Sequence, residues 1–118
     1  MSELSDPIGM NAATVQGCFG LSARALDLLC GVFAGQPQIS RALIYGSRAK
    51  GNYRTGSDID VVLDAPAMTF SELLRLKTSL DDLMLPHQID LSVLHQIDNP
   101  ALLDHIQRVG KPLWVRPD

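Results

Sequence analysis

The sequence predicts a two-layer α+β fold, in which helices cover one face of a small mixed β-sheet of about three principal strands. Two observations lead to this prediction. Short apolar or alternating segments predict strands at 39–45, 58–63 and 88–94. Apolar residues at helical spacing predict helices at 22–34, 70–83 and 100–109. The predicted helices lie before, between and after the strands along the chain, as expected for one small sheet with its connections.

The predicted helices have clear signals at their ends. Ser22 is placed to cap the first helix, which ends at Gly35. Thr69 and Glu72 have the spacing of a capping box at the start of the second helix. Asn99, followed by a proline, is a suitable start for the third helix. The residues expected to face the core are Leu21, Ala25, Leu26, Leu29, Val32 and Phe33; Phe70, Leu73, Leu76, Leu80 and Leu83; and Leu102, Leu103, Ile106 and Val109.

The chain of 118 residues is expected to form one domain, at residues 21–118, after a mobile N-terminal tail at residues 1–20. Hydrophobic residues make up 46% of the chain and charged residues 19%, which is the balance of an ordinary globular protein. Residues 113–115 are expected to add a short edge strand or to cover the core.

Charge and apolar pattern argue against several classes of protein. The net charge of −3 argues against a dedicated nucleic-acid binder, which is usually basic. No apolar run is long enough to span a bilayer, and the first residues lack a basic-then-apolar signal pattern. We therefore expect a cytoplasmic protein without a membrane partner. Cys18 and Cys30 are expected to be reduced, packed and without a functional role.

Asp58 and Asp60 give the strongest indication of function. Residues two apart on a strand point to the same face, so these carboxylates would project side by side. Adjacent carboxylates raise each other's pKa unless a cation lies between them. Carboxylate oxygens are ligands that Mg²⁺ prefers, so the pair predicts a metal site. Considered alone, the pair could also be a turn acid beside an exposed strand acid.

Gly46 and Ser47 form a turn directly after an apolar segment, and ten residues separate Ser47 from Asp58. Without a side chain, Gly46 allows a phosphate to approach the backbone, and Ser47 can donate its hydroxyl and N–H to that phosphate. Ser47 could instead only cap the turn. Arg48 and Lys50 are candidate ligands of a triphosphate, although cations beside a loop are often only solvated. Arg41 and Arg54 add to the basic charge expected near this turn.

Asp90 lies on a second alternating segment, with apolar residues on one face and acids or hydroxyls on the other. If the two acidic strands are neighbours, Asp90 joins Asp58 and Asp60, and three carboxylates can hold two magnesium ions. Otherwise Asp90 is an ordinary polar residue on a half-exposed strand. The histidines lack metal-ligand spacing and are expected to be ordinary surface or strand-end residues: His87, His95 and His105.

The arrangement Gly-Ser, ten residues, Asp-x-Asp and a later lone Asp on a strand resembles the DNA polymerase β-type nucleotidyltransferase superfamily. Within it, the short chain and the run GSRAKG at 46–51 are similar to the minimal nucleotidyltransferases, which are prokaryotic single-domain proteins. The resemblance covers about residues 21–114. It implies a nucleotidyltransferase core, and it implies that Asp90 helps to deprotonate the acceptor hydroxyl.

The sequence therefore predicts a magnesium-dependent nucleotidyltransferase that moves a nucleoside monophosphate, AMP from ATP in the first instance, to an acceptor hydroxyl. The small domain leaves little mass for an acceptor pocket, so we expect a macromolecular acceptor or a partner subunit. The resemblance implies an antitoxin that forms a hetero-oligomer with a HEPN-domain RNase toxin encoded nearby. In characterised cases such proteins add AMP to a tyrosine of that toxin.

Two other functions remain open at this point. The chain could be a non-catalytic antitoxin or binding module that neutralises its partner by occlusion, although occlusion alone does not need clustered acids. It could also be a nucleotidyltransferase for a small molecule, but such enzymes usually carry a further domain for the acceptor.

Overall fold

The computed structural model describes residues 19–54 and 56–117. Most of the predicted tail, residues 1–18 with Cys18, lies outside the described residues. The elements are α2 (Ala23–Ala34), β2 (Arg41–Tyr45), α3 (Gly46–Lys50), β3 (Ile59–Asp64), α4 (Phe70–Asp81), β4 (Ile89–Val93), a 3-10 turn η1 (Leu94–Gln96), α5 (Pro100–Val109) and β5 (Lys111–Val115).

The sheet has four strands in the order β4-β3-β2-β5. Strand β2 is antiparallel to both β3 and β5, whereas β3 and β4 are parallel. The predicted mixed sheet is therefore confirmed. The segment expected at 113–115 is an edge strand, longer than expected, and it makes β5 the fourth strand beside β2.

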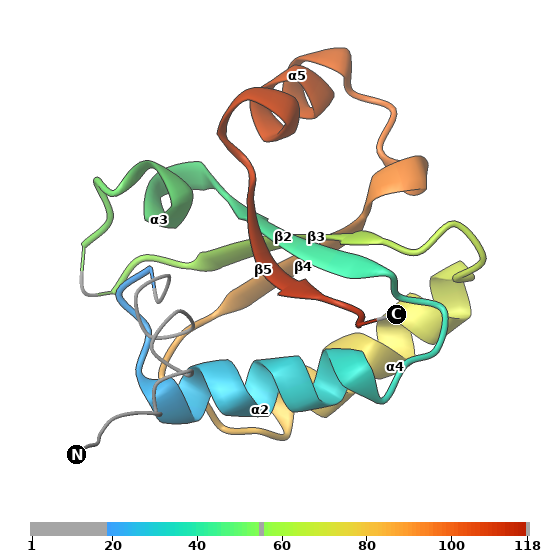
Figure 1. The fold of residues 1–118 in the computed structure, drawn as a ribbon, viewed down its shortest axis with the longest axis horizontal. Helices are drawn as coiled ribbons and strands as arrows, with labels where there is room; N and C mark the ends of the chain where they lie inside the picture. Colours follow the sequence, from blue (N-terminus) through green and yellow to red (C-terminus); the bar gives the residue numbers. More distant parts are fainter. Residues whose placement is uncertain (1–18, 55, 118) are drawn as a thin grey trace.

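Helices α2 and α4 cover one face of the sheet, as predicted, and the main core lies between them and the strands (Figure 1). Helix α5 lies on the opposite face (Figure 1), where Ile106 packs with Tyr45 and Val62 in a second, smaller apolar cluster. The expectation that helices cover one face thus describes α2 and α4 but not α5. Apolar side chains on this face, among them Leu43, Tyr45 and Val62, give α5 a surface to pack on.

The predicted helix starts are confirmed. The Ser22 hydroxyl accepts the Ala25 N–H at 3.0 Å, and Thr69 and Glu72 form the expected capping box. The Asn99 side chain accepts two backbone N–H groups at the start of α5. The prediction that Phe70 faces the core is wrong, because its side chain is 63% exposed and the buried stripe of α4 starts one turn later. Within the described part of the chain, no helix has the length and apolar character needed to cross a membrane.

Candidate active site

The register of the parallel pair β3–β4 brings two of the predicted acids together. Asp60 and Asp90 are directly paired across the two strands, and Asp58 lies one residue before β3 begins. Parallel neighbours in register point to the same face, so Asp60 and Asp90 project together from the face opposite α2 and α4. The strand adjacency on which the predicted role of Asp90 depended is therefore present.

The charges of these acids affect one another. The pKa of Asp60 is raised above its ordinary value, first by burial and then by the negative charges of Asp90 and Asp58. His105 on α5 has the opposite, smaller influence on this pKa. Asp58 and Asp90 themselves are exposed. The cluster thus combines one half-buried carboxylate with two carboxylates that reach solvent.

Gly46 places the backbone against the acidic cluster. Its φ is +74°, a conformation that glycine adopts without strain, and a Cβ there would collide with Oδ2 of Asp60. Helix α3 starts at this residue without a side-chain cap and ends at Gly51, whose φ is +87°. Ser47 is half-buried in this single turn, and its carbonyl accepts the N–H of Gly51. The turn predicted to bind phosphate therefore lies directly beside Asp60.

The four basic residues that the sequence placed near the phosphates lie in different surroundings. Arg48 is only 2% exposed, and its guanidinium donates to carbonyl groups of the protein. Lys50 is exposed at the end of α3, and Arg54 is exposed on the following loop. Arg41 forms an ion pair with Asp64 at 3.1 Å. It begins β2, four residues from Tyr45, which places it about 13 Å from the acidic end of the strand.

Three further residues near the acids received no functional role from the sequence. The pKa of the Tyr45 hydroxyl is raised, mainly by burial and also by the negative charges of Asp90 and Asp60, while Ser92 acts in the opposite direction. His105 packs edge-on against the Tyr45 ring, with the ring centroids 6.1 Å apart. Ser92 lies on β4 two residues after Asp90, and the alternation of the segment places it on the same face. The position of His105 has no sequence signal, because it depends on where α5 crosses the sheet.

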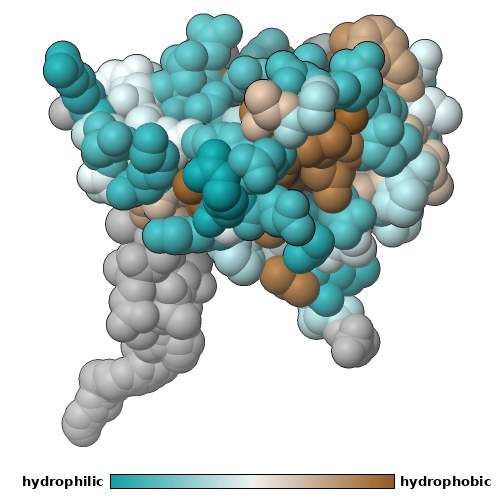
Figure 2. Space-filling model, turned by 90° about the horizontal axis from the view of Figure 1, so that it is seen from above, coloured by the Kyte–Doolittle hydropathy of each residue, from teal (hydrophilic) through white to brown (hydrophobic). Residues whose placement is uncertain are grey.

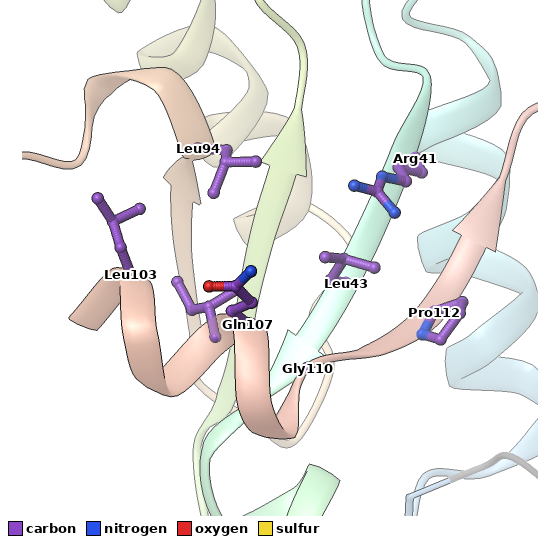
Figure 3. Close-up of a pocket in the computed structure, with 8 residues that line it drawn as sticks. Arg41, Leu43, Leu94, Leu103, Gln107, Gly110 and Pro112 are labelled. Carbon is purple, nitrogen blue, oxygen red and sulfur yellow. The ribbon is translucent and has the colours of Figure 1, made fainter. Parts of the chain in front are cut away.

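Two cavities border different parts of the molecule. One of about 350 Å³ is lined by Asp58 and Asp90 together with Lys77 of α4, another residue that the sequence did not indicate. A second, of about 570 Å³, lies under α5 between Leu103 and Leu43 of β2, toward Arg41 at the other end of that strand (Figure 3). From the α5 side, apolar side chains are seen gathered among hydrophilic ones (Figure 2).

The chemistry of the acidic cluster fits a hard divalent cation, which prefers carboxylate oxygens. The mutual repulsion that raises the pKa of Asp60 is the effect that such a cation would relieve. Within residues 19–54 and 56–117, however, no three Asp, Glu, His or Cys side chains already converge closely enough to hold a metal ion. The carboxylates are therefore suitable in kind and lie near one another, but they do not form a preformed metal site.

The fold is similar to chains in three toxin–antitoxin structures. A toxin–antitoxin with AMP-PNP aligns with a TM-score of 0.64 at 20% identity, covering 77% of this chain and 73% of that chain. MntA-HepT aligns at 0.60 and 18%, covering 80% and 74%. The tri-AMPylated HEPN toxin of Shewanella oneidensis in complex with MNT antitoxin aligns at 0.60 and 18%, covering 79% and 71%. Identities this low show a shared fold.

A search of curated proteins found no match to the sequence. In contrast, a family model described as "Polymerase beta, Nucleotidyltransferase" matches residues 29–118. The match includes the Gly46–Ser47 turn and all three acids, Asp58, Asp60 and Asp90. It covers most of the chain, and the chain therefore belongs to the polymerase beta nucleotidyltransferase family.

Proposed function

We propose that this nucleotidyltransferase is magnesium-dependent and moves a nucleoside monophosphate, AMP from ATP, to an acceptor hydroxyl with release of pyrophosphate. The observation that supports this most directly is the pairing of Asp60 with Asp90 beside a glycine whose missing side chain leaves room for the Asp60 carboxylate. A cluster of acids at a backbone turn is the arrangement needed to bind a metal and a triphosphate together.

In this proposal Asp58, Asp60 and Asp90 hold magnesium, with room for two ions as in related chemistry. When bound, magnesium neutralises the phosphates and favours ionisation of the acceptor hydroxyl. The backbone at Gly46 lies beside the Asp60 carboxylate and would approach the triphosphate there, and the Ser47 hydroxyl would donate to one of its phosphates. Asp90 is exposed, so its carboxylate is accessible to an acceptor and can take the proton of the attacking hydroxyl.

Of the other predicted phosphate ligands, Lys50 is exposed close to the turn and stays a candidate. Arg48 does not, because its guanidinium is buried and already donates to protein carbonyls. We therefore propose no direct contact between Arg48 and the nucleotide, and we assign it another role below.

The proposed acceptor is a tyrosine hydroxyl on a HEPN-domain toxin, with which this chain would form a cytoplasmic hetero-oligomer and act as antitoxin. Two of the similar structures support this choice: one contains AMP-PNP, and another contains a tri-AMPylated HEPN toxin in complex with MNT antitoxin.

The test is the intact mass of the HEPN-domain protein encoded beside this gene, after incubation with this chain and magnesium-ATP. We expect a gain of one or more AMP units, lost with EDTA and lost in the double variant Asp58→Asn, Asp60→Asn. Asp64→Asn is the matched control, because Asp64 lies on the same strand and face as Asp60 but at the other end, paired with Arg41. This control should transfer AMP normally.

The alternative function is a non-catalytic antitoxin that neutralises its partner by occlusion. The apolar cavity under α5, away from the acids, is a surface that such a partner could cover. If the toxin gains no mass while the wild-type chain and the double variant bind it and inhibit it equally, occlusion replaces nucleotide transfer as the function.

A further inference from the structure

We propose that Arg48 is a positioning residue that holds together the two loops leading into β3 and β4, and thereby sets the acids of these strands against one another. The role in fixing the loops does not depend on the proposed function, whereas the consequence for metal binding rests on it. Arg48 belongs to what we call the Arg48 cluster, formed by Arg48 with Phe19, Tyr53, Ser57 and His87.

The first link of the cluster reaches β3. Nε and Nη2 of Arg48 both donate to the carbonyl oxygen of Ser57, at 3.2 and 2.9 Å. Ser57 directly precedes Asp58, and β3 begins at the next residue. The loop between α3 and β3 is therefore fixed by Arg48 immediately before the first acid, so that the position of Asp58 depends on this bond.

The second link reaches β4. Nη2 of Arg48 lies 3.3 Å from Nδ1 of His87, and because a guanidinium can only donate, this imidazole nitrogen is the acceptor. Burial and the charge of Arg48 lower the pKa of His87, in agreement with a neutral ring. His87 precedes Gln88, whose carbonyl accepts the Ile59 N–H at 2.8 Å and so joins the two loops where the parallel pairing begins.

The third link reaches the segment before α2. Nη1 of Arg48 donates to the carbonyl of Phe19 at 2.9 Å, and its guanidinium carbon lies 5.0 Å from the centre of the Tyr53 ring. Gly20, with φ of +78°, has no room for a side chain because a Cβ would meet the same ring. One buried guanidinium thus contacts the start of the described chain and both loops that carry the acids.

Only arginine suits this position. Burying a cation is costly unless its donors are satisfied, and the described acceptors are two carbonyls and a neutral imidazole rather than a carboxylate. Lysine would keep the charge, but an ammonium cannot present the planar fork that reaches these acceptors together. A cation that was only solvated at the surface would not be buried to this extent. The position and bonds of Arg48 are those of a residue that fixes the loops before β3 and β4.

The test is amide hydrogen exchange in Arg48→Lys, with Arg116→Lys as the matched control. Arg116 also donates to backbone carbonyls and lies over an aromatic ring, Trp114, but it does not contact the loops before β3 and β4. The Ile59 amide reports the junction of those loops, and the Ser40 amide, which donates to Asp64, reports the other end of the sheet. In Arg48→Lys we expect Ile59 to exchange about tenfold faster relative to Ser40, the scale of one lost charged hydrogen bond.

An equal acceleration of both amides would show that Arg48 only supports global stability, and unchanged exchange at Ile59 would show that it fixes nothing there; either result overturns the inference. Arg116→Lys should leave Ile59 unchanged. Tyr53→Leu keeps the hydrogen bonds of Arg48 but removes the ring over it, and should accelerate Ile59 in the same direction by a smaller factor.

The consequence for the acids is measured by Mn²⁺ binding, followed by electron paramagnetic resonance without any nucleotide or acceptor. We expect Arg48→Lys to weaken binding about tenfold, and Arg116→Lys to bind as the wild type does. If the wild-type chain binds no Mn²⁺, the proposed function fails, while hydrogen exchange still decides the role of Arg48. If Arg48→Lys binds Mn²⁺ as tightly as the wild type, Arg48 does not position the acids.

Discussion

Two arginine clusters of similar construction lie at opposite ends of the sheet, one beside α3 and the other just beyond β5 (Figure 1). The Arg116 cluster comprises Arg116, the Trp114 ring and the carbonyls of Phe33, Gln36 and Ile39. In both clusters a guanidinium donates to carbonyls from distant segments and lies about 5 Å from an aromatic ring centre.

The two clusters differ in burial and in what they hold. Arg48 is almost fully buried and holds loops that lead to acids, whereas Arg116 is partly exposed and joins the end of α2 to the segment before β2. The same local chemistry thus joins segments of the core at one end of the sheet and joins the loops before Asp58 and Asp90 at the other. The role of a buried or half-buried arginine therefore depends on which segments it joins, because similar hydrogen bonds occur in both clusters.

The largest difference between the two ends of the sheet, in stability and in AMP transfer, is expected when a glycine near each end is replaced by alanine. Gly46→Ala would place a side chain against Asp60 at a positive φ, which costs about 1–3 kcal/mol of folding free energy. Displacing the Asp60 carboxylate should also lower the rate of AMP transfer about a hundredfold. Stability is measured by urea unfolding and transfer by the mass of the toxin.

The control for this prediction is Gly35→Ala, at the far end. Gly35 has an ordinary φ of −76°, and a Cβ there would meet backbone oxygens at 3.5 and 3.6 Å, which is normal contact. This variant should keep wild-type transfer. Equal losses in the two variants would show that the contact between Gly46 and Asp60 has no special importance.

Deleting the two guanidinium groups should have unequal effects on stability. Arg48→Ala removes an almost fully buried guanidinium and leaves two part-buried carbonyls without their donor, so it should lower the free energy of unfolding by about 3 kcal/mol. Arg116→Ala should cost about 1–2 kcal/mol, because water can reach the partly exposed site. Unfolding is best followed by far-UV circular dichroism, since Trp114 contacts Arg116 and its fluorescence would change directly. A larger loss for Arg116→Ala would contradict the comparison.

A smaller effect is expected from the capping box at the start of α4. The Thr69 hydroxyl accepts the Glu72 N–H, and the Glu72 carboxylate accepts the Thr69 N–H. Thr69→Ala should lower the free energy of unfolding by about 1 kcal/mol, the usual value of such a cap. Because α4 contributes no predicted acid, AMP transfer measured below the unfolding transition should be unchanged; a loss of transfer would extend the functional region to this helix.

Sequence patterns predicted the features that depend on nearby residues. The caps at Ser22, Thr69 and Asn99 are formed by partners two or three residues away, and all three are present. The alternation around Asp60 and Asp90 predicted that each acid lies on the face of its strand opposite the apolar residues. That the two strands are neighbours, in a register that pairs the two acids, is shown only by the structure.

Features that depend on distant residues could not be predicted in this way. Arg48 directly follows the Gly46–Ser47 turn, and its sequence neighbourhood is the same whether its side chain enters solvent or the interior. Its burial is decided by Phe19 and His87, which are 29 and 39 residues away. His105 likewise reaches the acids only because α5 packs on Tyr45 across the sheet.

The smallest predicted effect is a dependence of stability on pH that the Arg48 cluster should show and the Arg116 cluster should not. His87 has a folded-state pKa below its ordinary value of 6.5, so the folded state favours the neutral ring. Its contribution to stability is therefore complete above about pH 6.5 and is lost as the pH falls toward the lowered pKa. The acceptors described for Arg116 are backbone carbonyls, which do not titrate in this range.

Urea midpoints at pH 7.5 and 5.5 test this difference in the wild type and in His87→Gln, whose amide oxygen can still accept from Arg48 at either pH. The wild type should lose more stability between pH 7.5 and 5.5 than the variant does. Asp60 and the other acids are present in both proteins, so their contribution cancels when the loss in the variant is subtracted from the loss in the wild type. Ile59 exchange should accelerate with falling pH, after correction for the intrinsic rate, more than Ser40 exchange does. An identical pH dependence in the two proteins would mean that the His87 contact contributes nothing to the Arg48 cluster, leaving the Ser57 carbonyl as its effective link to the acids.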